Sequence, residues 1–137
     1  MNIVVDTNIF LAALIKEGLV RDLIINSKNN LLFPEFEFEE IRNHKLEIIQ
    51  KSQQSEKELN ILILRLLKYV KIIPADIVSP YRSEACEIMG QIDQDDVPFI
   101  ATALAFNASI WSDDKHFKKQ DRVNILTTKD IINLAGD

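Results

Sequence analysis

The strongest constraint on the fold is that short apolar segments, typical of buried β-strands, alternate with segments that have helical spacing. The first apolar segment, residues 2–5, is followed by Leu11, Leu14 and Ile15 at helical spacing. The other segments that we interpret as strands are residues 31–33, 70–73, 108–111 and 124–126. Strands that alternate with helices favour a parallel sheet covered on both faces. The sequence therefore predicts an α/β fold with three layers, α/β/α, around a short, mainly parallel central sheet.

One long helix is expected from Pro34 to about Lys51. Apolar residues follow Pro34 at helical spacing, at Phe38, Ile41 and Ile48. Proline is also favoured at the first position of a helix. We therefore expect an unbroken helix between the second and third predicted strands.

Three further helices carry local signals at their ends. Ser55 with Glu58 three residues later is the pattern of a capping box. Residues 80–89 have helical spacing, and the next residue is a glycine. Thr127 or Thr128 is expected to cap the last helix.

The composition is that of an ordinary globular protein. The 137 residues are 47% hydrophobic and 27% charged, so we expect one domain spanning 1–137. The single cysteine, Cys86, excludes an internal disulfide and makes a cysteine zinc site implausible. No signal peptide or membrane-spanning run is expected, because the longest apolar-rich stretch is short and interrupted. We therefore expect a cytoplasmic protein.

Acidic residues recur where the predicted strands and helices meet. Asp6 follows the first strand, Asp113 and Asp114 follow the fourth, and Asp95 and Asp96 precede a helix. Sites in parallel α/β sheets form at the C-terminal ends of the strands. Carboxylates gathered there repel one another, and a divalent cation between them relieves the repulsion. The pattern favours a metal-dependent enzyme.

Each acid also has a simpler explanation. Asp6 could only cap a helix, Asp113 and Asp114 could form a turn, and the acids at 95–96 could complement a helix dipole. No lysine or arginine stands beside Asp6 or Asp96 in the sequence to neutralise it. For this reason we favour a joint metal site over three unrelated roles.

The expected long helix adds the acids Glu35, Glu37, Glu39 and Glu40. Ile41 is expected in the core, which would place Glu40 at the margin of the buried face. Glu37, Glu40 and His44 share a side, so a contact between Glu40 and His44 is expected. Neither His44 nor His116 has a second histidine at ligand spacing, and we interpret both as non-ligands.

These segments together resemble the ordered signature of PIN domain nucleases. The resemblance rests on the strand ending in Asp6-Thr7-Asn8, on Glu40-Ile41, on residues 96–104 (DVPFIATAL) and on residues 111–117 (WSDDKHF). In that family acids bind magnesium or manganese and hydrolyse phosphodiester bonds, usually in RNA. Many members are toxin ribonucleases of toxin–antitoxin pairs.

The resemblance implies roles for individual residues. The acids implied to be catalytic and metal-binding are Asp6, Glu40, Asp96 and Asp114. Asp93 and Asp113 are candidate additional metal ligands, and Thr7, Asn8 and Ser112 are candidates for hydrogen bonds to the carboxylates. The metal-binding acid of the long helix could also be Glu37 or Glu39 instead of Glu40. In the same way, Asp113 could take the role of Asp114.

The resemblance also implies Mg²⁺ or Mn²⁺ as cofactor, an RNA substrate and an antitoxin protein as partner. A homodimer, the RNA target, DNA as substrate, and one or two metal ions all stay open. The alternative function is a catalytically inactive PIN-like module that binds RNA or protein. An aspartyl-phosphate enzyme is less favoured, because Asp6-Thr7-Asn8-Ile9 lacks a second acid close after the first.

The net charge of -5 argues against binding nucleic acid through a broadly basic surface. A local basic rim could still contact phosphates beside an acidic pocket. The candidate rim is Lys115, His116, Lys118, Lys119 and Arg122. The alternative for this run is an ordinary solvated turn.

Overall fold

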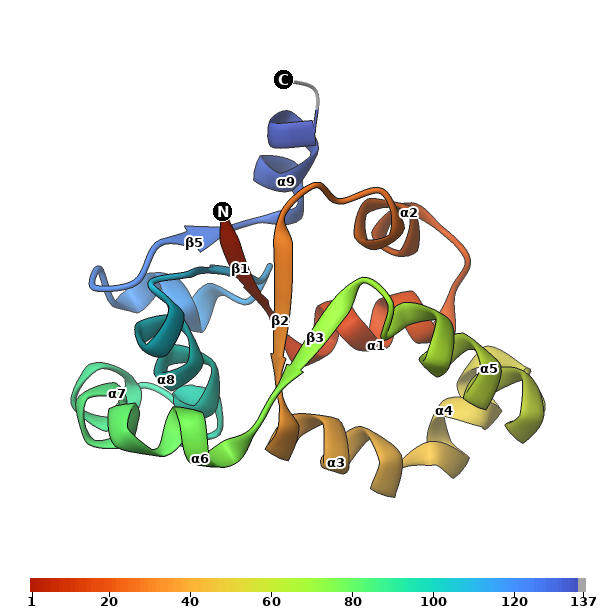
Figure 1. Ribbon diagram of the computed structural model, residues 1–137, viewed down its shortest axis with the longest axis horizontal. Coiled ribbons are helices and arrows are strands. Elements are labelled where there is room, and N and C mark those ends of the chain that lie inside the picture. Colours follow the sequence, from red (N-terminus) through yellow and green to blue (C-terminus); the bar gives the residue numbers. More distant parts are fainter. Residues whose placement is uncertain (136–137) are drawn as a thin grey trace.

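A five-stranded sheet forms the centre of the computed structural model, which describes residues 1–135. The strands are β1 (Asn2–Val5), β2 (Asn30–Pro34), β3 (Val70–Ile73), β4 (Ser109–Trp111) and β5 (Ile125–Leu126). Their order across the sheet is β3-β2-β1-β4-β5, and every neighbouring pair is parallel (Figure 1). The predicted α/β fold with a parallel sheet is confirmed.

Helices cover both faces of the sheet. They are α1 (Thr7–Ile15), α2 (Leu19–Ile25), α3 (Glu35–Asn43), α4 (Lys45–Ser52), α5 (Glu56–Leu66), α6 (Ala75–Val78), α7 (Arg82–Met89), α8 (Val97–Phe106) and α9 (Thr128–Ala135), with 3₁₀ turns η1 (Ser79–Tyr81), η2 (Gln94–Asp96) and η3 (Lys115–Lys119). On one side α8 packs on β1, β2 and β4, and α6 and α7 pack on α8. On the other side α1 contacts α2, α4 and α5 (Figure 1). The predicted three-layer architecture is thus observed.

The register of β1 and β4 determines where the site lies. Val5 pairs with Trp111, so the next residues, Asp6 and Ser112, leave the sheet side by side. The Asp6 backbone N–H still donates to the Trp111 carbonyl at 3.1 Å. Ile3, Val4 and Val5 are all buried, as expected of a strand that is covered on both faces. An apolar strand therefore ends directly in an acid.

Phenylalanines from four separate elements make a row beneath this edge of the sheet. The Phe10 and Phe33 rings are stacked with centroids 4.8 Å apart. Phe33 and Phe99 are 6.2 Å apart, and so are Phe99 and Phe117. All four residues are at most 2% exposed. The row joins α1, β2, α8 and η3 into one core, and such aromatic pairs are worth about 0.5–1.5 kcal/mol beyond their buried area.

The expectation of one helix from Pro34 to Lys51 is wrong. His44 has φ -108° and ψ 24°, which separates α3 from α4, and Pro34 ends β2 instead of opening the helix. The break preserves the apolar stripe, because Ile41 before it and Ile48 after it are both buried. The spacing of apolar residues therefore conceals the break.

Other expected boundaries agree with the structure more closely. The capping box is confirmed, since the Ser55 hydroxyl accepts from the Glu58 N–H and the Glu58 carboxylate accepts from the Ser55 N–H, both at 3.1 Å. One helix was expected at residues 80–89. In the structure its first residues belong to η1 and the rest form α7. Among residues 1–135, no helix is both long and apolar enough to cross a membrane.

Candidate active site

Asp6 is a buried carboxylate at the C-terminal end of β1. It is 5% exposed, and its Oδ2 accepts a hydrogen bond of 2.8 Å from the Ser112 hydroxyl. Although Asp6 precedes α1, its side chain makes no cap hydrogen bond to that helix. The explanation of Asp6 as a simple helix cap therefore does not account for its hydrogen bond with Ser112.

The environment of Asp6 opposes its negative charge. Burial raises the pKa of Asp6, and the nearby charge of Asp114 raises this pKa further. The Ser112 hydroxyl and the backbone N–H groups of Thr7 and Asn8 act in the opposite direction. The pKa of Asp6 is raised on balance, so its charged form is unfavourable in this environment. A cation nearby would stabilise the charged form.

Asp96 is placed similarly at the start of α8. Burial raises the pKa of Asp96 to about 7, with repulsion from Asp93, Asp6 and Asp114 as the next causes. Its Oδ2 is buried and has no hydrogen-bond partner among residues 1–135. Its side chain does not cap α8 either. A buried carboxylate oxygen without a partner is costly unless a ligand satisfies it.

Asp114 and Asp93 lie around these two buried acids. The Ser112 hydroxyl accepts from the Asp114 N–H at 3.0 Å, so one serine connects Asp6 to the following loop. Asp93 Oδ2 lies 3.2 Å from Nδ1 of His116, and its Oδ1 accepts from the Asp95 N–H. The structure therefore brings together Asp6, Asp93, Asp96 and Asp114 from three separate segments.

His116, which the sequence led us to interpret as a non-ligand, lies beside Asp93 and Asp96. Ligand atoms of Asp93, Asp96 and His116 all lie within 4.8 Å of one another. Nδ1 of His116 is also 3.6 Å from Asp114 Oδ1. The spacing of histidines could not indicate His116, because its neighbours are two carboxylates and not a second histidine. The available signal was its position two residues after Asp114.

On α3, Glu37 is the residue that faces the buried acids. The Thr7 hydroxyl donates to Glu37 Oε2 at 3.4 Å. Burial raises the pKa of Glu37, and the charges of Glu40, Asp95 and Asp6 add to this effect. The Glu40 side chain is 48% exposed, and its Oε2 lies 3.8 Å from Nε2 of His44, the contact expected from the sequence. The structure thus distinguishes Glu37, which faces the buried acids, from Glu40, which faces His44.

The remaining candidates lie at the margin. Asp113 Oδ1 accepts from the Thr128 N–H at 2.8 Å and its Oδ2 accepts from the Thr128 hydroxyl at 2.6 Å, so this carboxylate is bonded to the start of α9. Asn8 is exposed in the first turn of α1. Glu39 is also exposed and lies 3.6 Å from Arg42.

The expected basic rim follows Asp114 in η3. Lys115, Lys118 and Lys119 are exposed. Arg122 is already engaged, because it donates to Glu84 on α7 at 2.7 Å. Three lysines thus remain on the surface beside the acids.

The donor set fits a hard divalent cation. Carboxylate oxygens are the preferred ligands of magnesium and manganese, and the partnerless Asp96 Oδ2 is a ready ligand atom. Ser112 orients Asp6, as hydrogen bonds to ligating carboxylates commonly do in metal sites. The arrangement can hold a cation between Asp6, Asp96 and their acidic neighbours.

Comparisons with known proteins agree with this arrangement. No curated protein matches the chain in sequence. Among solved structures, VapBC2 from Rickettsia felis, bound to a DNA fragment from its promoter, has TM-score 0.72 and 17% identity, covering 93% of this chain and 98% of that one. VapBC-1 from nontypeable Haemophilus influenzae has TM-score 0.68 and 15% identity over 94% of this chain and 99% of that one.

A third similar structure is PAE2754 from Pyrobaculum aerophilum, with TM-score 0.67 and 12% identity over 99% of this chain and 90% of that one. At these identities the three structures show a shared fold. The PIN domain family profile matches residues 4–132, nearly the whole chain and every acid described above. The chain belongs to the PIN domain family.

Proposed function

We propose that the protein is a ribonuclease that uses Mg²⁺ or Mn²⁺ to hydrolyse phosphodiester bonds, and that it is the toxin of a toxin–antitoxin pair. The observation that carries the proposal is Asp96. Its buried Oδ2 has no partner among residues 1–135, and the pKa of Asp96 is raised to about 7 in the midst of other acids. Such an arrangement is unfavourable for folding alone and suits a cation site.

Four acids would hold the cation: Asp6, Asp96, Asp93 and Asp114. A bound divalent cation would supply positive charge to a phosphodiester and lower the pKa of water for hydrolysis. Ser112 would keep Asp6 in position through its 2.8 Å hydrogen bond. His116, 3.2 Å from Asp93, would restrict the rotation of that carboxylate.

Glu37 would act at the edge of this group. The Thr7 hydroxyl orients its carboxyl group, and burial raises its pKa. A carboxyl group with a raised pKa is a stronger base than an ordinary glutamate, which suits it to proton transfer beside a metal site. We therefore assign to Glu37 the position on the helix that the sequence left open between Glu37, Glu39 and Glu40.

The antitoxin partner is proposed from the family. PIN domain nucleases generally use divalent metals, and many of them are toxins with a dedicated antitoxin. Two of the similar structures are VapBC structures, which is consistent with a partner of this kind. Co-purification of the chain with the product of an adjacent gene would test this part of the proposal.

Cleavage of a single-stranded RNA, with and without Mg²⁺ or Mn²⁺, tests the nuclease directly. Asp6→Asn should abolish metal-dependent cleavage, because it removes one charge from the site at nearly constant volume. Asp22→Asn changes an exposed acid on α2 and serves as the matched control, with cleavage near wild type.

Thermal melting of the same preparations separates loss of chemistry from loss of fold. Without metal, Asp6→Asn should melt no lower than wild type, because repulsion with Asp114 is relieved. Undiminished cleavage by Asp6→Asn, or equal cleavage in a chelator, would contradict the proposal. Binding of RNA without any cleavage would favour the inactive-module alternative.

A further inference from the structure

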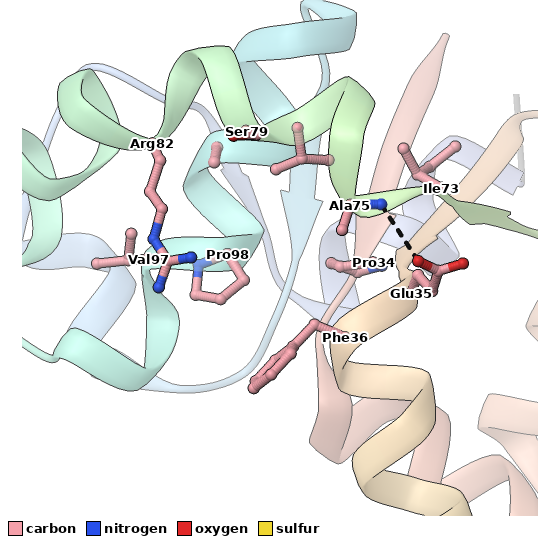
Figure 2. Close-up of a pocket in the computed structure, with 11 residues that line it drawn as sticks. Pro34, Glu35, Phe36, Ile73, Ala75, Ser79, Arg82, Val97 and Pro98 are labelled. Atoms are coloured by element: carbon pink, nitrogen blue, oxygen red, sulfur yellow. Dashed lines mark hydrogen bonds between the residues drawn. The ribbon is translucent and has the colours of Figure 1, made fainter.

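An apolar cavity lies between α3, α6 and α8. The apolar cavity has a volume of about 220 Å³ and is lined by side chains that include Ile73, Val78 and Ala101. Typical small-molecule sites measure roughly 300–1,000 Å³, so this cavity suits a smaller group such as one planar ring system. Its walls come from the ends of β2 and β3, from α6, and from the N-terminal parts of α3, α7 and α8 (Figure 2).

A second cavity adjoins this apolar cavity at the first turn of α3. Its lining includes the acids Glu37, Glu40 and Asp95, of which Glu37 is the one that we assign to the edge of the acidic site. Phe36, Arg82 and Pro98 line both cavities, so the two are parts of one groove. We call this continuous surface the side groove.

Phe36 is an aromatic side chain without cover at the junction of the two cavities. It is 61% exposed although it occupies the first turn of α3, directly before Glu37. Figure 2 shows its ring pointing into the opening that also faces Pro98. An exposed aromatic ring beside an apolar cavity is a surface on which an unstacked base can lie.

Arg82 supplies the positive charge of the side groove. Of the described residues that line the two cavities, it alone is a lysine or arginine. No ion pair joins it to a carboxylate within residues 1–135. Figure 2 shows its side chain reaching from α7 toward Val97 and Pro98. In a chain of net charge -5, a free guanidinium next to the acids is placed to contact a phosphate.

We propose that the side groove holds one nucleotide of a single-stranded RNA substrate next to the phosphate that is cut. The base stacks on Phe36 and enters the apolar cavity, and the guanidinium of Arg82 contacts the adjoining phosphate. A base in a duplex is already stacked and paired, so the side groove selects single-stranded RNA. This inference rests on the proposed nuclease function and adds to it two substrate-contacting residues, Phe36 and Arg82.

The test uses a short single-stranded RNA in which one nucleotide at a time is made abasic. For the wild-type chain, one position beside the cut should show a loss in kcat/KM of about tenfold, the size expected for one base stacked on an aromatic ring. Phe36→Ala should lose about as much on the intact RNA and should no longer respond to the abasic position. Phe36→Trp should restore both the rate and the response.

Arg82→Gln should weaken RNA binding and reduce its dependence on salt. The matched controls are Leu46→Ala, a 76% exposed apolar residue on α4, and Arg65→Gln, an exposed arginine on α5. Both controls should behave as wild type. If Phe36→Ala keeps the wild-type response at every abasic position, the side groove does not hold a base, and the proposal is overturned.

Binding of the same RNAs, measured by fluorescence anisotropy on the Asp6→Asn background, separates this inference from the nuclease function. Cleavage by wild type that is unaffected by Phe36→Ala and Arg82→Gln would overturn the side groove and leave the nuclease intact. Binding that depends on Phe36 and on one base, together with no cleavage by the wild-type chain in Mg²⁺ or Mn²⁺, would support the side groove and contradict the nuclease. Phe36→Ala that weakens only a protein partner would overturn the RNA assignment.

Discussion

Asp96 shows at the scale of one residue how the site is tuned. Its carboxylate is 9% exposed, and its Oδ2 has no partner within the described part of the chain. Burial and four neighbouring acids raise the pKa of Asp96 to about 7 from a usual value of 3.8. The folded, metal-free chain therefore holds a proton that the unfolded chain releases at lower pH.

The first prediction is a pH dependence of stability in the absence of metal. Between about pH 3.8 and pH 7 the folded state binds more protons at Asp96 than the unfolded state does, so stability falls as pH rises through this window. The raised pKa values of Asp6 and Glu37 act in the same direction. One pKa unit corresponds to about 1.4 kcal/mol, so the total loss is on the order of a few kcal/mol.

Thermal melting in a chelator from about pH 4 to about pH 8 measures this slope. Asp96→Asn should flatten it, because the substituted amide does not titrate. Asp76→Asn changes an exposed acid on α6 and is the control. A slope that is identical in wild type and Asp96→Asn would contradict the assignment of the protonated group.

The second prediction distinguishes the two glutamates of α3. Glu37→Gln should reduce cleavage by roughly 10- to 100-fold, as is common for groups next to metal ligands. Glu40→Gln should leave the rate near wild type, because Glu40 lies 3.8 Å from His44 on an exposed side. Steady-state cleavage of one RNA by both variants decides between them, and the reverse order would return the role to Glu40.

At the scale of single elements, the sequence predicted the strands well. The third strand was expected at 70–73 and is observed as Val70–Ile73. Apolar runs that end at acids, prolines or polar turns determine such boundaries, because a parallel strand must be buried on both faces. The residues that follow β1 and β4 were therefore expected at one edge, and the register of Val5 with Trp111 places them there.

The rotation of α3 could not be predicted from the sequence. Ile41 is buried and Phe36 is exposed, which turns Glu37 toward Thr7 and leaves Glu40 outside. From the sequence, Glu40 was expected at the margin of the buried face because it stands beside Ile41, and the apolar spacing did not determine which glutamate faces the site. The contact between His116 and Asp93 could not be predicted from the sequence either, because the two residues are 23 positions apart.

The third prediction tests the cap of α5. Ser55→Ala removes the hydroxyl that accepts from the Glu58 N–H and should cost about 1 kcal/mol of stability. For a chain of this size the melting temperature should fall by about 4 °C. Ser83→Ala, an exposed serine within α7, is the control and should not lower it. RNA cleavage at room temperature should be unaffected by either change.

At the scale of the whole molecule, charge is distributed unevenly. The net charge is -5, and several of the acids gather at one end of the sheet. The exposed lysines of η3 lie directly after Asp114. An acidic protein can then bind a polyanion only where cations border the acids.

The fourth prediction concerns this border. Replacement of Lys118 and Lys119 together by Gln should weaken RNA binding and lower the slope of log affinity against log salt by about 0.7 for each lost phosphate contact. Lys68 and Lys71, near the start of β3, give the matched double control. Affinity for metal should be unchanged in both. An unchanged salt slope in the η3 variant would mean that this run is only a solvated turn.

Trp111 can serve as an intrinsic fluorescent probe of the site. Trp111 is the single tryptophan of the chain, it is fully buried, and its indole N–H donates to the Thr128 hydroxyl at 3.0 Å. Its carbonyl accepts from the Asp6 N–H. Because this indole lies one residue before Ser112, its emission should shift when a cation draws the carboxylates together. A fluorescence titration with Mn²⁺ or Mg²⁺ can therefore follow occupancy of the site without substrate, label or turnover.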